Sequence, residues 1–234
     1  MNDAEKLARF VEQQIPNFQY AVFPVQRHMG ALIMDACIQA GLDYDTVVKP
    51  RVDTVANDPE LSTAEGVMKN PERMLKAAVD HPQKKECIMQ LASFFRQNRI
   101  NTVIALRMKY WDIRNSLTNI KFINYKTRDY IGLLAGVSDV VAIDRYLRQF
   151  AGQAGIQVGK LSQSPSQSEY DRLFNTYVSA ANLLGISPSQ LDYAVWTYMN
   201  GDRISEIGGK INKTMKFIGD TFDVLSIIAN FFKR

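Results

Sequence analysis

The chain of 234 residues is 46% hydrophobic and 22% charged, and it is long enough for one large domain or two lobes around a sizeable core. Its formal net charge of +4 and its pI near 9.0 permit nucleic-acid binding without requiring it. Two cysteines fifty residues apart exclude a disulfide scaffold and a four-cysteine iron–sulfur cluster, and two isolated histidines argue against a zinc site.

The first half of the chain is predicted to be helical with one long irregular connection. The periodicity of apolar residues and the proline and glycine positions predict helices over 3–14, 27–40, 71–80 and 84–99. Gly41 is suited to closing the second of them, and His28, near its start, is expected to be a surface or capping residue. We expect 42–61 to be a connection with at most short helical turns, followed by a possible capping box of Ser62 and Glu65.

The second half is also predicted to be helical, so the fold class is all-α. Helices are expected over 102–120, 127–136, from Asp144 onward, and over 169–184, with a loop over 155–168. A further helix is expected to begin at Pro188, with Ser187 as its N-cap. The last segment, 205–234, is predicted to be an appended amphipathic helix, too short and too interrupted by charges to cross a membrane.

One stretch carries chemistry as well as helical pattern. The sequence IKFINYK, from Ile120 to Lys126, is typical of a tight hairpin between two helices, and VAIDRY, from Val141 to Tyr146, follows it. Lys126 and Asp144 stand 18 residues apart, at 126 and 144, so a helix that runs out and turns back can bring an amine beside a carboxylate. Such a pair suits covalent catalysis by a neutral lysine.

These two segments resemble the core of the helix-hairpin-helix DNA glycosylase superfamily, which includes endonuclease III and the 8-oxoguanine DNA glycosylases. The family hairpin has the form L-x-G-x-G-x-K, and a V-D-x-H-like segment follows it about eighteen residues later. Phe122 and Asn124 stand where the family has glycines, and Tyr146 stands where a histidine is common. The resemblance implies a two-lobed, all-α body over 1–204, with the helix-hairpin-helix at about 107–136 and no iron–sulfur cluster.

The resemblance also implies roles for individual residues. Lys126 matches the lysine that attacks the sugar C1′, and Asp144 matches the catalytic aspartate. The hairpin and the helix beginnings near it are expected to hold DNA phosphates. The residues expected to bind DNA are Lys121, Asn124, Tyr125, Thr127, Arg145 and Arg148, and Asp192 and Trp196 are expected to line a base pocket.

The resulting interpretation is a DNA glycosylase with AP lyase activity that flips and excises a damaged or modified base, with oxidised purines such as 8-oxoguanine favoured. It needs no metal or redox cofactor, and its partner is double-stranded DNA. Two alternatives remain open. One is a monofunctional glycosylase acting on another modified base, including the hypermodified bases of viral DNA. The other is a non-catalytic helical DNA-binding module.

The expected location follows from the beginning of the sequence and from the cysteine content. MNDAEKLARF is acidic and amphipathic, which is not the pattern of a signal peptide. We therefore expect a reducing, cytoplasmic setting, with the protein associated with the nucleoid if its source is prokaryotic. Self-association through the C-terminal helix is a further possibility, and no membrane partner is expected.

Overall fold

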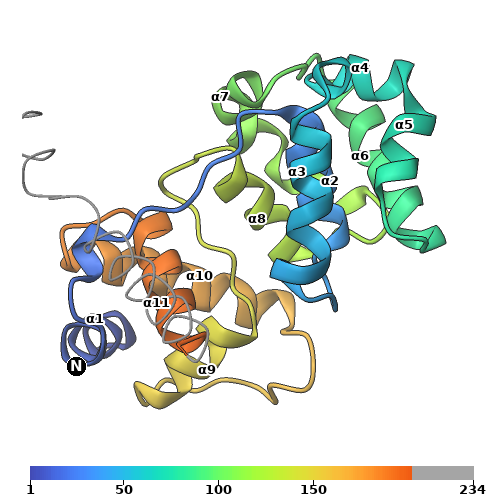
Figure 1. Cartoon of the computed structure of the whole chain (residues 1–234). Helices are drawn as coiled ribbons and strands as arrows, with labels where there is room; N and C mark the ends of the chain where they lie inside the picture. The colour runs from blue at the N-terminus through green and yellow to red at the C-terminus, as the bar shows by residue number, and fades with distance from the viewer. Residues whose placement is uncertain (202–234) are drawn as a thin grey trace, which may run out of the picture. The chain divides into compact units, whose positions relative to one another are not determined.

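The computed structural model describes residues 1–201, and the regular structure in that range consists of helices without strands (Figure 1). The all-α prediction is confirmed for this part of the chain. The chain divides into two compact units, Met1–Val195 and Trp196–Arg234. The boundary predicted after residue 204 and the C-terminal extension 205–234 lie outside the described residues. No helix among residues 1–201 is long and apolar enough to cross a membrane.

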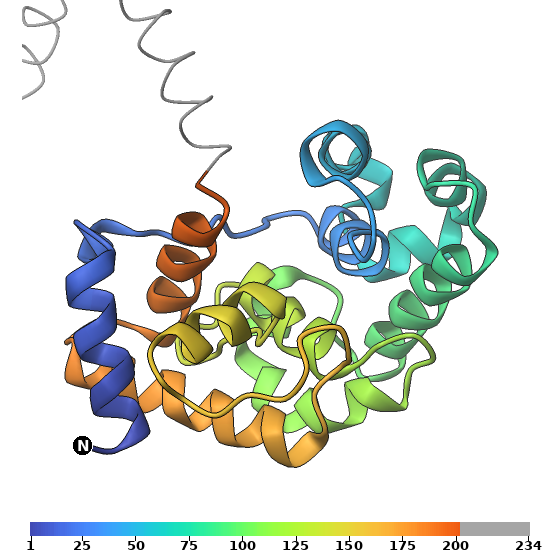
Figure 2. The same ribbon diagram turned by 90° about the horizontal axis from the view of Figure 1, so that it is seen from below.

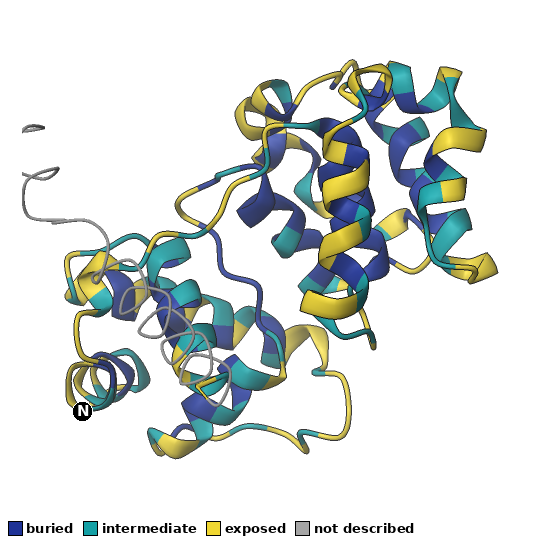
Figure 3. Cartoon of the chain, in the orientation of Figure 1, coloured by how far each residue is buried: buried dark blue, intermediate teal, exposed yellow. Residues whose placement is uncertain are grey.

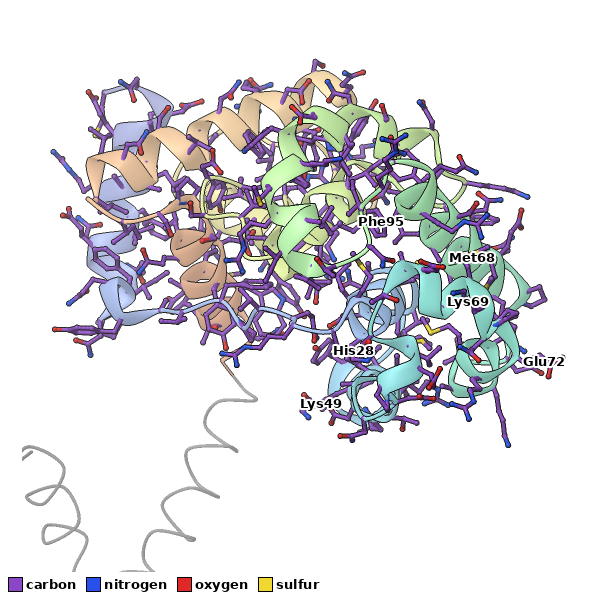
Figure 4. All side chains as sticks on the ribbon, turned by 90° about the horizontal axis from the view of Figure 1, so that it is seen from above. His28, Lys49, Met68, Lys69, Glu72 and Phe95 are labelled. Carbon is purple, nitrogen blue, oxygen red and sulfur yellow. The ribbon has the colours of Figure 1, made fainter. Side chains whose placement is uncertain are left out.

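The first group of helices in Met1–Val195 surrounds one hydrophobic core. That core is formed by buried side chains between Met29 and Ala142, and Phe95 is among its largest members (Figure 4). The helices that contribute are α2 (Met29–Ile38), α3 (Lys49–Ala56), α4 (Ala64–Lys69), α5 (Pro71–Ala77), α6 (Pro82–Gln97), α7 (Val103–Ile113) and α8 (Tyr125–Leu134).

The second group brings the N-terminus against helices from the second half of the chain. It comprises α1 (Asp3–Gln14), α9 (Arg145–Gln153), α10 (Gln167–Leu183) and the first turns of α11 (Pro188–Met199). Helices α1 and α10 lie side by side (Figure 2). Phe10 of α1 packs on Phe150 of α9 with ring centroids 4.9 Å apart. The first helix therefore completes the hydrophobic core of the second group.

The two groups are joined by an extended segment that is itself buried. Val137, Val140, Val141, Ala142 and Ile143 are each at most 6% exposed, and the segment stands out as buried in Figure 3. Because a buried chain must satisfy its backbone groups, its hydrogen bonds reach neighbouring helices, as at Ala142, whose amide donates to Asp192 of α11 at 2.7 Å. The segment delivers Asp144 to a fixed place beside α8.

Most predicted helices are present with shifted ends. Helix α1 has the predicted bounds, and His28 is the N-cap of α2, where its Nδ1 accepts the Ala31 amide. Gly41, with φ of +74°, occupies the left-handed region expected after that helix. Ser187 and Gln190 bond reciprocally at the start of α11, which confirms the predicted cap. At these positions, neighbouring residues in the sequence were sufficient to predict the helix ends.

The prediction for 42–61 was wrong. A π-helical turn, Tyr44–Val48, leads directly into the eight-residue helix α3. Pro50 does not prevent this, because it lies in the first turn, where its missing N–H would have had no helical partner. Burial of Val52 and Val55 against α2 stabilises a helix that its own sequence favours weakly.

Two boundaries also differ from the prediction. The N-cap of α4 is Thr63 rather than Ser62, and its hydroxyl accepts from the Gly66 amide at 2.9 Å. The helix expected to run to Ile120 ends as α7 at Ile113 and continues as a 3₁₀ helix, Arg114–Asn119.

Candidate active site

The turn before α8 contains a residue with an unusual backbone conformation. Phe122 has φ of +72°, a conformation that glycine adopts far more easily than a bulky residue. Asn124 then caps α8, and its side-chain oxygen accepts from the Thr127 amide at 2.9 Å. This cap places Lys126 in the first turn of the helix.

Lys126 is half-buried and held by two groups. Its Nζ donates to Oε1 of Gln39 at 2.8 Å and lies 4.4 Å from the centre of the Tyr130 ring. Burial lowers the pKa of the amine, and the carboxylates of Asp144, Asp192 and, less strongly, Asp35 act in the opposite direction. The lysine is therefore in a setting that makes its neutral, nucleophilic form more accessible than at the surface.

Asp144 is the N-cap of α9, and its charge acts on the Lys126 amine. One of its oxygens accepts the amides of Tyr146 and Leu147 at 2.8 and 2.9 Å. Burial raises the pKa of this carboxyl, while the charge of Lys126 and the two amide hydrogen bonds lower it. The structure thus brings together the two residues that the sequence singled out as catalytic.

Asp192, on α11, is a second carboxyl in this neighbourhood. It is 5% exposed and accepts the Ala142 amide at 2.7 Å. Burial is the main cause that raises its pKa to about 8, and nearby Asp144 adds to the rise. At neutral pH it is mainly an uncharged acid, so it does little to balance the charge of Lys126.

The sequence interpretation missed a third carboxyl, Asp35. It is fully buried on α2 and accepts from the hydroxyls of Tyr130 and Tyr44, both at 3.1 Å, and from Gln26 at 3.4 Å. Burial raises its pKa, and these hydrogen bonds lower it. An aspartate inside the apolar run MGALIMDACI was a signal that this helix serves a polar site.

A cluster of hydrogen bonds around Asp129 connects α8 to its neighbouring helices. The fully buried carboxylate of Asp129 accepts two hydrogen bonds from Arg114, at 2.8 and 2.7 Å, and two from Arg128, both at 2.9 Å. The hydroxyls of Tyr110 and Tyr170 donate to it at 2.6 and 2.9 Å. The cluster ties α7 and α10 to α8, so the helix that carries Lys126 has a rigid support.

Among the residues expected to bind DNA, those of the hairpin are the more accessible. Lys121 is exposed and pairs with Glu86 at 3.1 Å. Asn124 is exposed and serves as the helix cap described above. Tyr125 is half-buried, and its hydroxyl donates to Gln167 at 3.0 Å. The hairpin thus offers one cation and several polar groups at the beginning of α8.

The other expected DNA contacts differ in their surroundings. Thr127 is 8% exposed and faces the interior. Arg145, the first residue of α9, is exposed. Arg148 is 3% exposed, and its guanidinium donates to Glu169 at 3.1 Å and to the Gln163 carbonyl at 2.7 Å. Arg148 therefore holds the loop before α10, and Arg145 is the guanidinium of the two that is free to meet a phosphate.

The remaining predicted residue is Trp196, and the surface clefts are lined by residues other than the proposed catalytic pair. Trp196 belongs to the second compact unit, and its place in a base pocket stays a prediction. The described surface has a cleft of about 410 Å³ beside Arg172 and one of about 180 Å³ beside Phe23, neither lined by Lys126 or Asp144. Among residues 1–201, no group of three or more His, Cys, Asp or Glu is placed to hold a metal ion.

No protein family model, curated protein or solved structure matches the chain. The arguments for function therefore come from the site itself.

Proposed function

We propose that this protein is a DNA glycosylase with AP lyase activity, in which Lys126 is the nucleophile and Asp144 assists it. The observation that carries the proposal is the half-buried amine of Lys126, with its lowered pKa, in electrostatic interaction with the Asp144 carboxylate at the beginning of α9. A lysine whose burial favours its neutral form is suited to attack an electrophilic sugar carbon.

The proposed reaction begins with attack of the neutral Lys126 amine on C1′ of an extruded nucleotide. The N–C1′ bond forms as the glycosidic bond breaks, and the base leaves with the bonding electron pair and takes up a proton. Asp144 stabilises the positive charge that develops on the sugar and accepts a proton from the attached amine. Opening of the sugar ring gives a Schiff base, and β-elimination then releases the 3′ phosphate.

DNA binding is supported by the beginning of α8 and its hairpin. A helix N-terminus offers unpaired backbone N–H groups and a partial positive charge, which suit a phosphate. Exposed Lys121 and Arg145 flank the two helix beginnings that carry the catalytic pair. Extrusion of a nucleotide costs a few kcal/mol and is easiest for a damaged pair. Entry to Lys126 also requires the half-buried side chains around it to move apart.

The resemblance favours an oxidised purine such as 8-oxoguanine as the base removed. Phe122 and Asn124 depart from the glycines of the family hairpin, so another modified base, including the hypermodified bases of viral DNA, remains an alternative substrate.

The first experiment is borohydride trapping on duplexes that carry an abasic site, 8-oxoguanine, uracil or a bulky modified cytosine. The wild type is expected to form a covalent adduct with at least the abasic duplex, and Lys126→Gln is expected to form none. Lys69→Gln is a matched control, because Lys69 is an exposed lysine on α4 (Figure 4). Its amine pairs with Glu65 rather than with a residue of the proposed site. Lys69→Gln should trap as the wild type does.

The other outcomes separate the alternatives. Alkali-labile sites without any trapped adduct would support a monofunctional glycosylase, in which Asp144 activates water. Binding to the duplexes with neither adduct nor base release would favour a non-catalytic DNA-binding module. Equal trapping by Lys126→Gln would refute the assigned nucleophile.

A further inference from the structure

Among the described residues, the side chain of Gln39 forms a hydrogen bond only with Lys126. It lies at the C-terminal end of α2, and its Oε1 accepts from Nζ of Lys126 at 2.8 Å. Its Nε2 is buried and has no hydrogen-bond partner in the protein. A buried amide nitrogen without a hydrogen-bond partner is unfavourable. A glutamine that only connects two helices normally has both of its polar atoms hydrogen-bonded, and Gln39 does not.

The position of Gln39 is itself held firmly. Lys84 of α6 donates to the carbonyls of Ile38 and Ala40, at 2.8 and 2.7 Å, on either side of it. One turn earlier on α2, Asp35 accepts from the hydroxyl of Tyr130, whose ring lies beneath the Lys126 amine. The acceptor oxygen and the aromatic ring therefore meet the amine from two fixed directions.

The chemical type of the acceptor matters for a nucleophilic lysine. Asp35, Asp144 and Asp192 are the ionisable groups whose charges act on Lys126 from the other elements. A carboxylate in direct contact would favour the charged ammonium, which cannot attack carbon. A carboxamide oxygen orients the amine through a hydrogen bond and adds no net charge. A glutamine therefore orients the Lys126 amine and reduces its nucleophilicity less than a carboxylate would.

We propose that Gln39 is the positioning residue of the Lys126 nucleophile, with its Oε1 as a neutral acceptor that aims Nζ at the substrate sugar. This inference rests on the proposed function for its catalytic meaning. The hydrogen bond between the two side chains is independent of that function.

The experiment compares the full chain with Gln39→Met and Gln39→Glu. The first replaces the acceptor with a side chain of similar length, and the second replaces it with a charged acceptor. Lysine side-chain NMR, with the Lys126 signal assigned from its loss in Lys126→Gln, gives the titration of the amine. Gln97→Met is the matched control, because Gln97 is an exposed glutamine on α6.

Opposite shifts are expected in the two variants. Loss of the acceptor in Gln39→Met should lower the titration midpoint of Lys126, and the added charge in Gln39→Glu should raise it. A residue that merely supports the fold would not move the midpoint in opposite directions. Gln97→Met should leave it unchanged. Equal Lys126 midpoints in wild type and both Gln39 variants would overturn the proposal.

Trapping on the abasic duplex then tests the catalytic consequence. At high pH, where the amine is neutral in every variant, Gln39→Met is expected to trap about tenfold or more slowly, because the amine is no longer aimed. An unchanged rate at that pH would overturn the positioning role. If the wild type forms no adduct while the NMR midpoints shift as expected, the Lys126–Gln39 contact stands and the proposed lyase function fails.

Discussion

The raised pKa of Asp192 makes a quantitative prediction about stability. Its folded-state pKa is about 8, against an ordinary value of 3.8, because the carboxyl is buried beside Asp144. Between these values the native protein holds a proton that the unfolded chain releases. The stabilisation from this group is therefore fully present below about pH 4 and is lost as the pH rises toward 8. At about 1.36 kcal/mol for each pH unit, the total is about 5 to 6 kcal/mol.

The substitution Asp192→Asn removes this titration and keeps the shape of the side chain. The amide oxygen can still accept the Ala142 N–H that Asp192 accepts at 2.7 Å. The unfolding free energy of Asp192→Asn relative to the wild type should therefore increase with pH. The expected increase is about 3 kcal/mol between pH 5 and pH 7, and the difference should level off above about pH 8.

Urea unfolding followed by circular dichroism at a series of pH values measures this difference. Subtracting the wild-type curve removes the titration of other groups that the substitution leaves alone. Asp112→Asn provides the matched control for the Asp-to-Asn replacement itself, because Asp112 is exposed on α7. A difference for Asp192→Asn that stays flat would show that Asp192 is ionised in the native protein and would refute the reasoning.

Two further predictions concern the support of α8 and its hairpin. Asp129→Ala leaves the guanidinium groups of Arg114 and Arg128 without their buried partner, and it should lower the unfolding free energy by about 3 to 5 kcal/mol in urea; a loss below about 1 kcal/mol would contradict this. Phe122→Gly relieves a φ of +72° and should raise stability by about 1 kcal/mol. It should also tighten binding to an abasic-analogue duplex in fluorescence anisotropy, and weaker binding would count against the hairpin as the phosphate site.

The hydrophobic pattern and the capping residues were enough to predict most helices, while the catalytic roles of Lys126 and Asp144 stay a prediction. Asp144 combines the signals of an N-cap with a fixed spacing from the hairpin, so its role at the start of α9 follows from neighbouring residues. Helix α3 was missed because its stability comes from burying Val52 and Val55 rather than from its own propensity. Packing of that kind has no local signal.

The sequence alone determined that the described chain is helical, where most of its helices begin, and which amine and carboxylate are candidates for catalysis. Only the tertiary structure decided what surrounds them. Gln39 meets Lys126 across 87 positions, and Tyr130 meets Asp35 across 95. The pKa of Asp192 is raised because distant segments exclude water from it. Burial and long-range contacts set the pKa of each group and the aim of the amine, and these depend on how the helices pack.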